Sequence, residues 1–144
     1  MSGNRVIFPL KDSPFVRVKL ENPHAPVQPI EILALIDTGA YASAIPASFC
    51  PFLGHSFEKG LSESLTTGIG AGSIRTFAHS TKLTLLSSME DGALPAFEPI
   101  EFPCGFIEQS LSFMLLGQQD FLRMFQYAQN GKEGWFSLEQ IKHS

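Results

Sequence analysis

The stretch ILALIDTGAYASAI, residues 32–45, is the most informative part of this chain. Five apolar residues, Ile32 to Ile36, run directly into the carboxylate of Asp37, and Thr38 and Gly39 follow at once. The apolar run is rich in Ile and Leu and too short for a typical helix before the break at Gly39, so it predicts a buried strand. A carboxylate at the end of a buried strand costs free energy unless another group pairs with it or uses it. We therefore expect the Asp37 carboxylate either to pair with another polar group or to take part in the chemistry of the protein.

Length and composition predict one compact soluble domain over residues 1–144. A chain of 144 residues can bury one core and is too short for two ordinary domains. Its 44% hydrophobic and 17% charged residues, with 12 Gly and 10 Pro, suit a turn-rich folded domain better than a disordered one. The net charge is −4 and the ten Lys and Arg are scattered, which argues against nucleic acid or an anionic membrane as a partner.

No apolar run has the length of a membrane span, and residues 1–12 lack the apolar core of a signal peptide. We therefore expect a cytoplasmic protein and leave residues 1–12 otherwise unassigned. Cys50 and Cys104 have neither zinc-ligand spacing nor the number needed for a disulfide scaffold, so we expect reduced, buried thiols. The four histidines share no ligand spacing either, and we expect no metal and no cofactor.

Alternating and interrupted apolar runs predict a mostly β chain with a single helix. The segment QQDFLRMFQYA, residues 118–128, spaces Phe121, Leu122, Phe125 and Ala128 at helical intervals and is the one segment predicted to be a helix. Residues 45–53 have room for one helical turn between two prolines. The other predicted elements are a strand at 13–22, a proline-rich loop at 23–29, strands at 96–107 and 110–117, a turn at Asn130-Gly131 and a last strand around 135–138.

Residues 65–87 contain two β-prone arms around Gly68, Gly70 and Gly72, which predicts a hairpin with a glycine-rich tip. The tip lacks the Lys-Ser/Thr ending of a P-loop and the strand-to-helix context of a dinucleotide site. A phosphate-binding role is therefore not expected.

The tetrapeptide Asp37-Thr38-Gly39-Ala40 has a physical reason at each position. A carboxylate paired with a second carboxylate can activate a water for attack on a peptide carbonyl. The Thr38 hydroxyl can lock the loop, Gly39 lets the chain turn and a substrate approach, and Ala40 leaves space beside the carboxylate. Taken alone, the same residues also suit an ordinary turn or a helix N-cap.

Three elements in a fixed order resemble the retropepsin-like aspartic proteases, the single-lobe enzymes of the retroviral type. The Asp-Thr-Gly-Ala loop is followed about thirty residues later by the glycine-rich hairpin, and about eighty residues later by the apolar-apolar-Gly segment of MLLGQQDFL, residues 114–122. The resemblance covers about residues 13–138, the expected core. It implies an all-β acid protease fold, a closed β-barrel with a flap hairpin and one short C-terminal helix.

The same resemblance implies the site. Asp37 is the expected catalytic residue, on a floor that includes Leu35 and Ile36. The implied active-site loop is Thr38, Gly39 and Ala40; the flap is Gly68, Ile69, Gly70, Ala71 and Gly72; and the supporting loop is Leu116 and Gly117.

Three features depart from the retroviral pattern. Gln118 stands where those enzymes usually carry an Arg whose ion pair supports the cleft and dimer, so that ion pair is absent or replaced. Tyr41 is larger than the residue often found two places after the catalytic Gly. Residues 88–104 have no assigned counterpart.

Only Asp37 follows an apolar strand and precedes Thr-Gly; Asp12, Asp91 and Asp120 do not. A two-carboxylate mechanism then requires a second copy of the chain, which predicts a homodimer that cleaves peptide or protein substrates as an aspartic endopeptidase. One alternative is a non-catalytic peptide-binding or dimerisation module of the same fold. The other is an unrelated small β-barrel in which Asp37 is a turn residue. A serine nucleophile is disfavoured because neither Ser43 nor Ser48 has a histidine near it in sequence.

Overall fold

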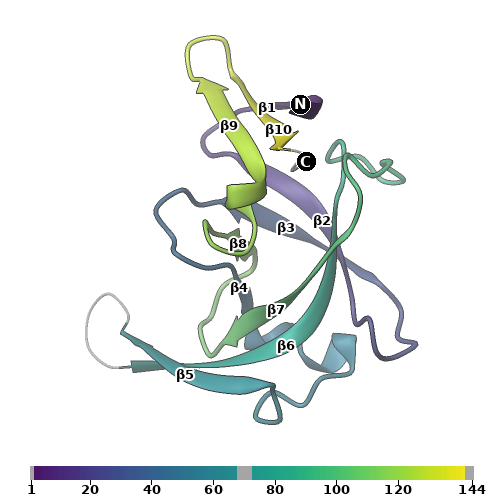
Figure 1. The fold of residues 1–144 in the computed structure, drawn as a ribbon, viewed down its shortest axis with the longest axis vertical. Coiled ribbons are helices and arrows are strands. Elements are labelled where there is room, and N and C mark those ends of the chain that lie inside the picture. The colour runs from purple at the N-terminus through teal and green to yellow at the C-terminus, as the bar shows by residue number, and fades with distance from the viewer. Residues whose placement is uncertain (1, 68–72, 142–144) are drawn as a thin grey trace.

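The computed structural model describes residues 2–67 and 73–141 (Figure 1). In these ranges the chain is almost entirely β, as predicted. The strands are β1 (Ser2–Pro9), β2 (Phe15–Glu21), β3 (Ile30–Ile36), β4 (Ala44–Pro46), β5 (Ser62–Thr67), β6 (Ser73–Leu85), β7 (Ile100–Ile107), β8 (Met114–Leu116), β9 (Phe125–Asn130) and β10 (Trp135–Ile141). Three single turns of 3-10 helix complete the described elements: η1 (Ala47–Phe49), η2 (Pro51–Leu53) and η3 (Leu122–Met124).

Six strands close a barrel in the order β2-β3-β8-β4-β7-β6, and β6 pairs back with β2. Two of the pairings, β3 with β8 and β4 with β7, are parallel. β5 pairs with the first half of the long strand β6, and this hairpin extends from the barrel at the bottom of Figure 1. The closed barrel, the hairpin and one short helical turn near the C-terminus confirm the predicted fold class. The hairpin tip, residues 68–72, lies outside the described residues.

Period-2 alternation builds the barrel core. In β2, Val16, Val18 and Leu20 are buried while the residues between them are only partly buried. On the outer side, Arg17 pairs with Glu31 of β3 at 3.0 Å. Each fully buried Val, Leu or Ile contributes about 1.5–3 kcal/mol relative to its exposed state, so the register of β2 is firmly set because a one-residue slip would expose all three.

A second sheet, β1-β10-β9, packs on the barrel and joins the two ends of the chain. Phe8 of β1 stacks on Phe136 of β10 with ring centroids 5.1 Å apart, and both are buried. The sequence left residues 1–12 unassigned. The structure places most of them in this sheet because Val6 and Phe8 alternate toward the core.

The helix predicted over residues 118–128 is wrong for most of its length. Helical geometry is confined to η3, and from Phe125 onward the chain is strand β9, which pairs with β10. Phe125 and Tyr127 lie on one side of that strand with Gln126 and Ala128 on the other, so the segment also satisfies a period of two. Pairing with β10 makes residues 125–130 a strand, because the antiparallel hydrogen bonds to β10 extend over all of them.

Of residues 88–104, the part up to residue 99 is an irregular excursion, and residues 100–104 are the first half of β7. Leu86 and Pro95 make an isolated β-bridge, and Phe97 is buried against Phe125 with ring centroids 4.9 Å apart. Cys50 and Cys104 are buried free thiols, as predicted. Burial raises the pKa of the Cys50 thiol to about 11, and burial together with the charge of Asp120 raises that of Cys104, so both thiols stay protonated and unreactive.

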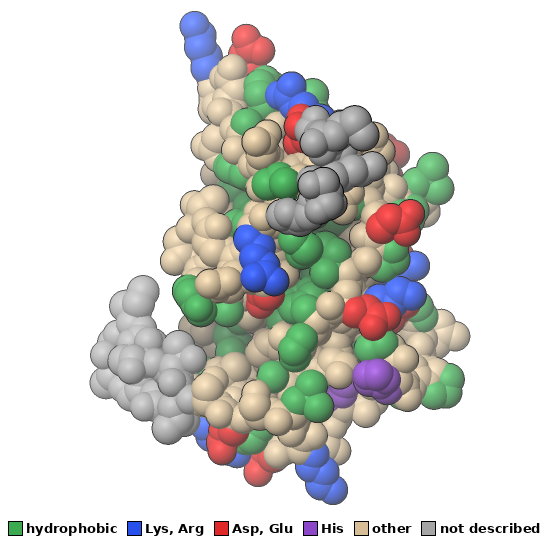
Figure 2. Space-filling view, in the orientation of Figure 1, with side chains coloured by type: hydrophobic (Ala, Val, Ile, Leu, Met, Phe, Trp, Pro, Cys, Tyr) green, Lys and Arg blue, Asp and Glu red, His purple; other side chains and the backbone are tan. Residues whose placement is uncertain are grey.

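Charged side chains of both signs are interspersed over the face shown in Figure 2. Within residues 2–67 and 73–141, no helix is both long and apolar enough to cross a bilayer. The cytoplasmic location stays a prediction.

Candidate active site

The loop after β3 holds Asp37 half-exposed at the barrel surface. Its N–H donates to the carbonyl of Leu116 at 2.9 Å, and its own carbonyl accepts the N–H of Ala40 at 3.2 Å. The Oδ1 atom accepts the N–H of Gly39 at 3.0 Å. The carboxylate at the end of a buried strand thus keeps contact with solvent and gains a backbone donor, which offsets the cost of its position.

Leu116 and Gly117 lie directly beside this loop. Leu116 pairs in parallel with Ile36, the residue before Asp37, and is fully buried. A Cβ atom on Gly117 would lie 2.5 Å from the carbonyl carbon of Ala42 and 2.6 Å from its oxygen. Only glycine permits this approach, so the structure brings the predicted supporting loop and the Asp-Thr-Gly loop together through a backbone contact.

A hydrogen-bonded pair of the buried Ser43 and the partly buried Asp120 holds the same two loops together. The Ser43 N–H donates to both carboxylate oxygens of Asp120, at 3.1 and 3.0 Å, and its hydroxyl donates to Oδ1 at 2.6 Å. The Ser43 Oγ in turn accepts the N–H of Gly117 at 2.9 Å. The sequence predicts neither role, because it excludes Asp120 as a catalytic carboxylate and offers Ser43 only as a disfavoured nucleophile. No local signal links the two residues, which lie 77 positions apart.

Gln118 provides a neutral contact where the retroviral pattern has an arginine. Its Nε2 donates to the carbonyl of Thr38 at 2.9 Å, and its backbone N–H donates to the carbonyl of Ala40 at 3.0 Å. The backbone N–H of Gln119 donates to the backbone carbonyl of Tyr41 at 2.8 Å. As predicted from Gln118, the ion pair of the retroviral pattern is replaced, here by hydrogen bonds to the loop that follows Asp37.

A groove of about 610 Å³ begins at Ala40, three residues after Asp37. It lies between the loop at residues 40–44 and the two arms of the β5–β6 hairpin, with Ser64 and Ile74 on the arms and Ile107 of β7 in its wall. Tyr41 contributes to its edge and is 73% exposed. The predicted flap residues Gly68 to Gly72 belong to the undescribed tip of this hairpin.

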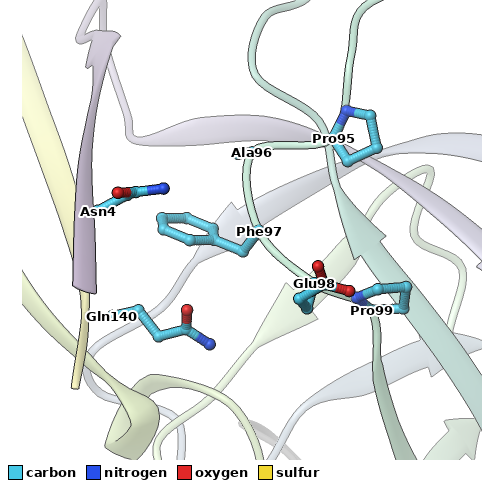
Figure 3. A pocket seen from close by; sticks show the side chains of 7 residues that line it. All are labelled: Asn4, Pro95, Ala96, Phe97, Glu98, Pro99 and Gln140. Carbon is cyan, nitrogen blue, oxygen red and sulfur yellow. The ribbon is translucent and has the colours of Figure 1, made fainter. Parts of the chain in front are cut away.

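A second hollow of about 420 Å³ lies away from the aspartate, between β1, β10 and residues 95–99 (Figure 3). The Phe97 ring projects between the carboxamides of Asn4 and Gln140, and Glu98 and Pro99 stand on the other side. Glu98 is its one ionisable lining residue, so it lacks the grouped side chains that catalysis requires. In the part of the chain that is described, no cluster of three or more His, Cys, Asp or Glu side chains is placed to hold a metal ion.

No family model and no curated protein matches the sequence. The backbone is similar to that of a solved structure, a retropepsin-like aspartic protease from Rickettsia conorii, with a TM-score of 0.59 over 94% of this chain and 98% of that one. The fold is retropepsin-like. Sequence identity between the two chains is 16%, so the likeness concerns the retropepsin-like fold.

Proposed function

We propose that the protein is an aspartic endopeptidase, active as a homodimer in which each subunit contributes Asp37. The observation that carries the proposal is the position of Asp37: a half-exposed carboxylate at the end of β3, held by backbone hydrogen bonds beside Gly117 in a retropepsin-like fold. The groove that starts at Ala40 gives an extended peptide a place to lie next to that carboxylate.

The other three aspartates are engaged elsewhere, which supports a second copy as the source of the second carboxylate. Asp120 is bonded to Ser43. Asp91 pairs with Arg17 on the surface, and Asp12 lines a different hollow with Phe15. A two-fold axis beside Asp37 supplies the missing carboxylate without any further residue.

The chemistry follows from bringing the two carboxylates together. At about 3 Å they would repel by roughly 5 kcal/mol at an effective dielectric constant near 20, so one keeps its proton, as is usual in aspartic proteases. The ionised member takes a proton from a water, and the protonated member donates to the carbonyl oxygen of the scissile bond. Activity should be highest at mildly acidic pH. Thr38, Gly39 and Ala40 are the direct neighbours of the reacting carboxylate, and the proposed mechanism uses no cofactor.

Mixing subunits tests the proposal. Asp37→Asn should abolish peptide cleavage while leaving unfolding and dimerisation unchanged, because a carboxamide of the same shape cannot act as the base. In a one-to-one mixture of wild type and Asp37→Asn, random pairing leaves about one quarter of the dimers with two carboxylates. Activity should therefore fall to about one quarter of that of the wild type alone at the same total protein concentration. A value near one half would show that each subunit works alone. A wild type that stays monomeric and cleaves nothing in a peptide library from about pH 4 to 7 would contradict the proposal.

A further inference from the structure

One peptide group of the Asp37 loop is hydrogen-bonded at both ends. Its N–H, which belongs to Gly39, donates to the carboxylate oxygen Oδ1 of Asp37 at 3.0 Å. Its carbonyl, which belongs to Thr38, accepts a hydrogen bond from Nε2 of Gln118 at 2.9 Å. The C=O and N–H of a trans peptide point in opposite directions, so these groups form one chain from the Gln118 carboxamide to the Asp37 carboxylate.

The backbone of Gln118 is held on both sides, so its side chain starts from a defined point. Its N–H donates to the carbonyl of Ala40 at 3.0 Å, and its own carbonyl accepts the N–H of Arg123 at 3.0 Å. The close approach of Gly117 to the backbone of Ala42 keeps the same segment beside the Asp37 loop. The carboxamide of Gln118 therefore meets the Thr38 carbonyl although the two residues are 80 positions apart in the chain.

We propose that Gln118 is a positioning residue for the Asp37 carboxylate and acts on it through the Thr38–Gly39 peptide. The inference rests on the proposed function, in which that carboxylate activates the water. A donor on the Thr38 carbonyl opposes rotation of the peptide plane, so the Gly39 N–H stays directed at Oδ1. The same donor polarises the peptide, because hydrogen bonds in a chain strengthen one another by about 10–30%.

The Asp37 side chain depends on this one peptide for its orientation. Over residues 2–67 and 73–141, the Gly39 N–H is the only group that donates a hydrogen bond to the Asp37 carboxylate. If the peptide plane turned, no second donor in these ranges would hold the carboxylate in place. Gln118 fixes the plane with a neutral group and so adds no charge beside the carboxylate.

Two substitutions distinguish the hydrogen bond from the mere presence of a side chain. Gln118→Met keeps an unbranched side chain of similar length and removes the N–H. Gln118→Arg restores an N–H at the same distance along the side chain, because Nε of arginine and Nε2 of glutamine are separated from the Cα by the same number of carbon atoms. Gln118 is exposed, so both variants should unfold at about the same urea concentration as the wild type.

Steady-state cleavage of a peptide gives the first measurement. Gln118 acts on the carboxylate and not on the substrate, so Gln118→Met should lower kcat by about three- to tenfold and leave KM unchanged. Gln118→Arg should return kcat to within about twofold of the wild type. The matched control is Gln28→Met, the same change at an exposed residue before β3, about 20 Å from the Asp37 end of that strand, and it should leave both constants unchanged.

The amide proton of Gly39 separates this inference from the proposed function, because NMR detects it whether or not the protein cleaves peptides. Gln118→Met should move the Gly39 signal upfield, since a weaker hydrogen bond leaves the proton better shielded, and Gln118→Arg should move it back. The amide of Ala40 donates to the backbone carbonyl of Asp37 and should keep its position. These shifts in a wild type that cleaves nothing would support the positioning role and refute the protease alone.

Three results would overturn the inference whether or not cleavage occurs. The first is a Gly39 signal that does not respond to Gln118→Met. The second is an equal movement of the Gly39 and Ala40 signals, which would mean that the whole loop has shifted. The third is an effect of Gln118→Met, on the Gly39 signal or on kcat, that Gln118→Arg does not reverse. Where the wild type does cleave, an unchanged kcat in Gln118→Met also overturns it.

Discussion

Replacing Gly117 with alanine should separate the two loops that form the candidate site. The new Cβ would lie 2.5, 2.6 and 2.9 Å from three backbone atoms of Ala42, whereas carbon atoms in contact prefer about 3.5–4.0 Å. Since no flexible side chain can move away, one loop must shift by roughly 1 Å. Overpacking of this kind costs about 1–3 kcal/mol, and the shift also weakens the bond from the Gly117 N–H to Ser43, a loss of about 1 kcal/mol.

The expected loss of unfolding free energy is therefore about 3 kcal/mol, equivalent to a fall in Tm of about 10 °C for a domain of this size. Urea unfolding followed by circular dichroism measures it. Because the Asp37 N–H bonds to Leu116, the shift also displaces the carboxylate, and a misplacement of about 1 Å can lower kcat about a hundredfold.

Gly131→Ala is the matched control. Gly131 has no atom within 4 Å of an added Cβ and does not have a positive φ, so this variant should stay within about 0.5 kcal/mol of wild type. If Gly117→Ala unfolds at the same urea concentration as Gly131→Ala, the close backbone approach is not a property of the folded protein, and the account of the supporting loop fails.

Two further predictions concern buried polar groups. Asp120→Ala should lose about 2–3 kcal/mol in urea unfolding, because the buried Ser43 N–H and hydroxyl lose their acceptor; Asp120→Asn, which keeps one carbonyl oxygen, should lose less, and equal losses would refute the reasoning. Burial lowers the pKa of His55, and the charge of the neighbouring His79, whose ring centroid is 4.5 Å away, lowers it further, against an opposing hydrogen bond to the Ser80 carbonyl. The unfolded chain then takes up a proton first, so the stability contributed by neutral His55 is present above about pH 6.5 and is lost as pH falls toward the lowered pKa. The unfolding free energy of wild type minus that of His55→Phe should therefore fall between about pH 7.5 and 5, and a constant difference would contradict the shift.

The strand before Asp37, the hairpin and the turn at Asn130-Gly131 could all be predicted from the sequence, because each depends on residues that are neighbours in the chain. The alternation in β2 and the apolar run of β3 specify strands locally. The glycine of the supporting loop, Gly117, also marks a backbone approach that only glycine allows.

What could not be predicted depends on partners far along the chain. The bond between Ser43 and Asp120 joins residues 77 positions apart, and nothing in either neighbourhood specifies the other. The segment from Phe125 to Ala128 satisfies both a helical and a β period, so its structure is decided by β10 and not by its own pattern. Residues 2–9 become a strand for the same reason.

The pairing of β1 with β10 also constrains the order in which the chain can fold. Ser2 pairs with Ile141, so β1 is synthesised before all other described strands but has no partner until β10 has been synthesised. β9 and β10 are joined by a short turn and can form a hairpin early, whereas β1 must close a loop of almost the entire chain length. Docking of β1 should be the last and slowest step of folding. Until then its backbone is an unpaired strand edge, which makes the nascent chain prone to aggregation until β10 has been synthesised and paired with it.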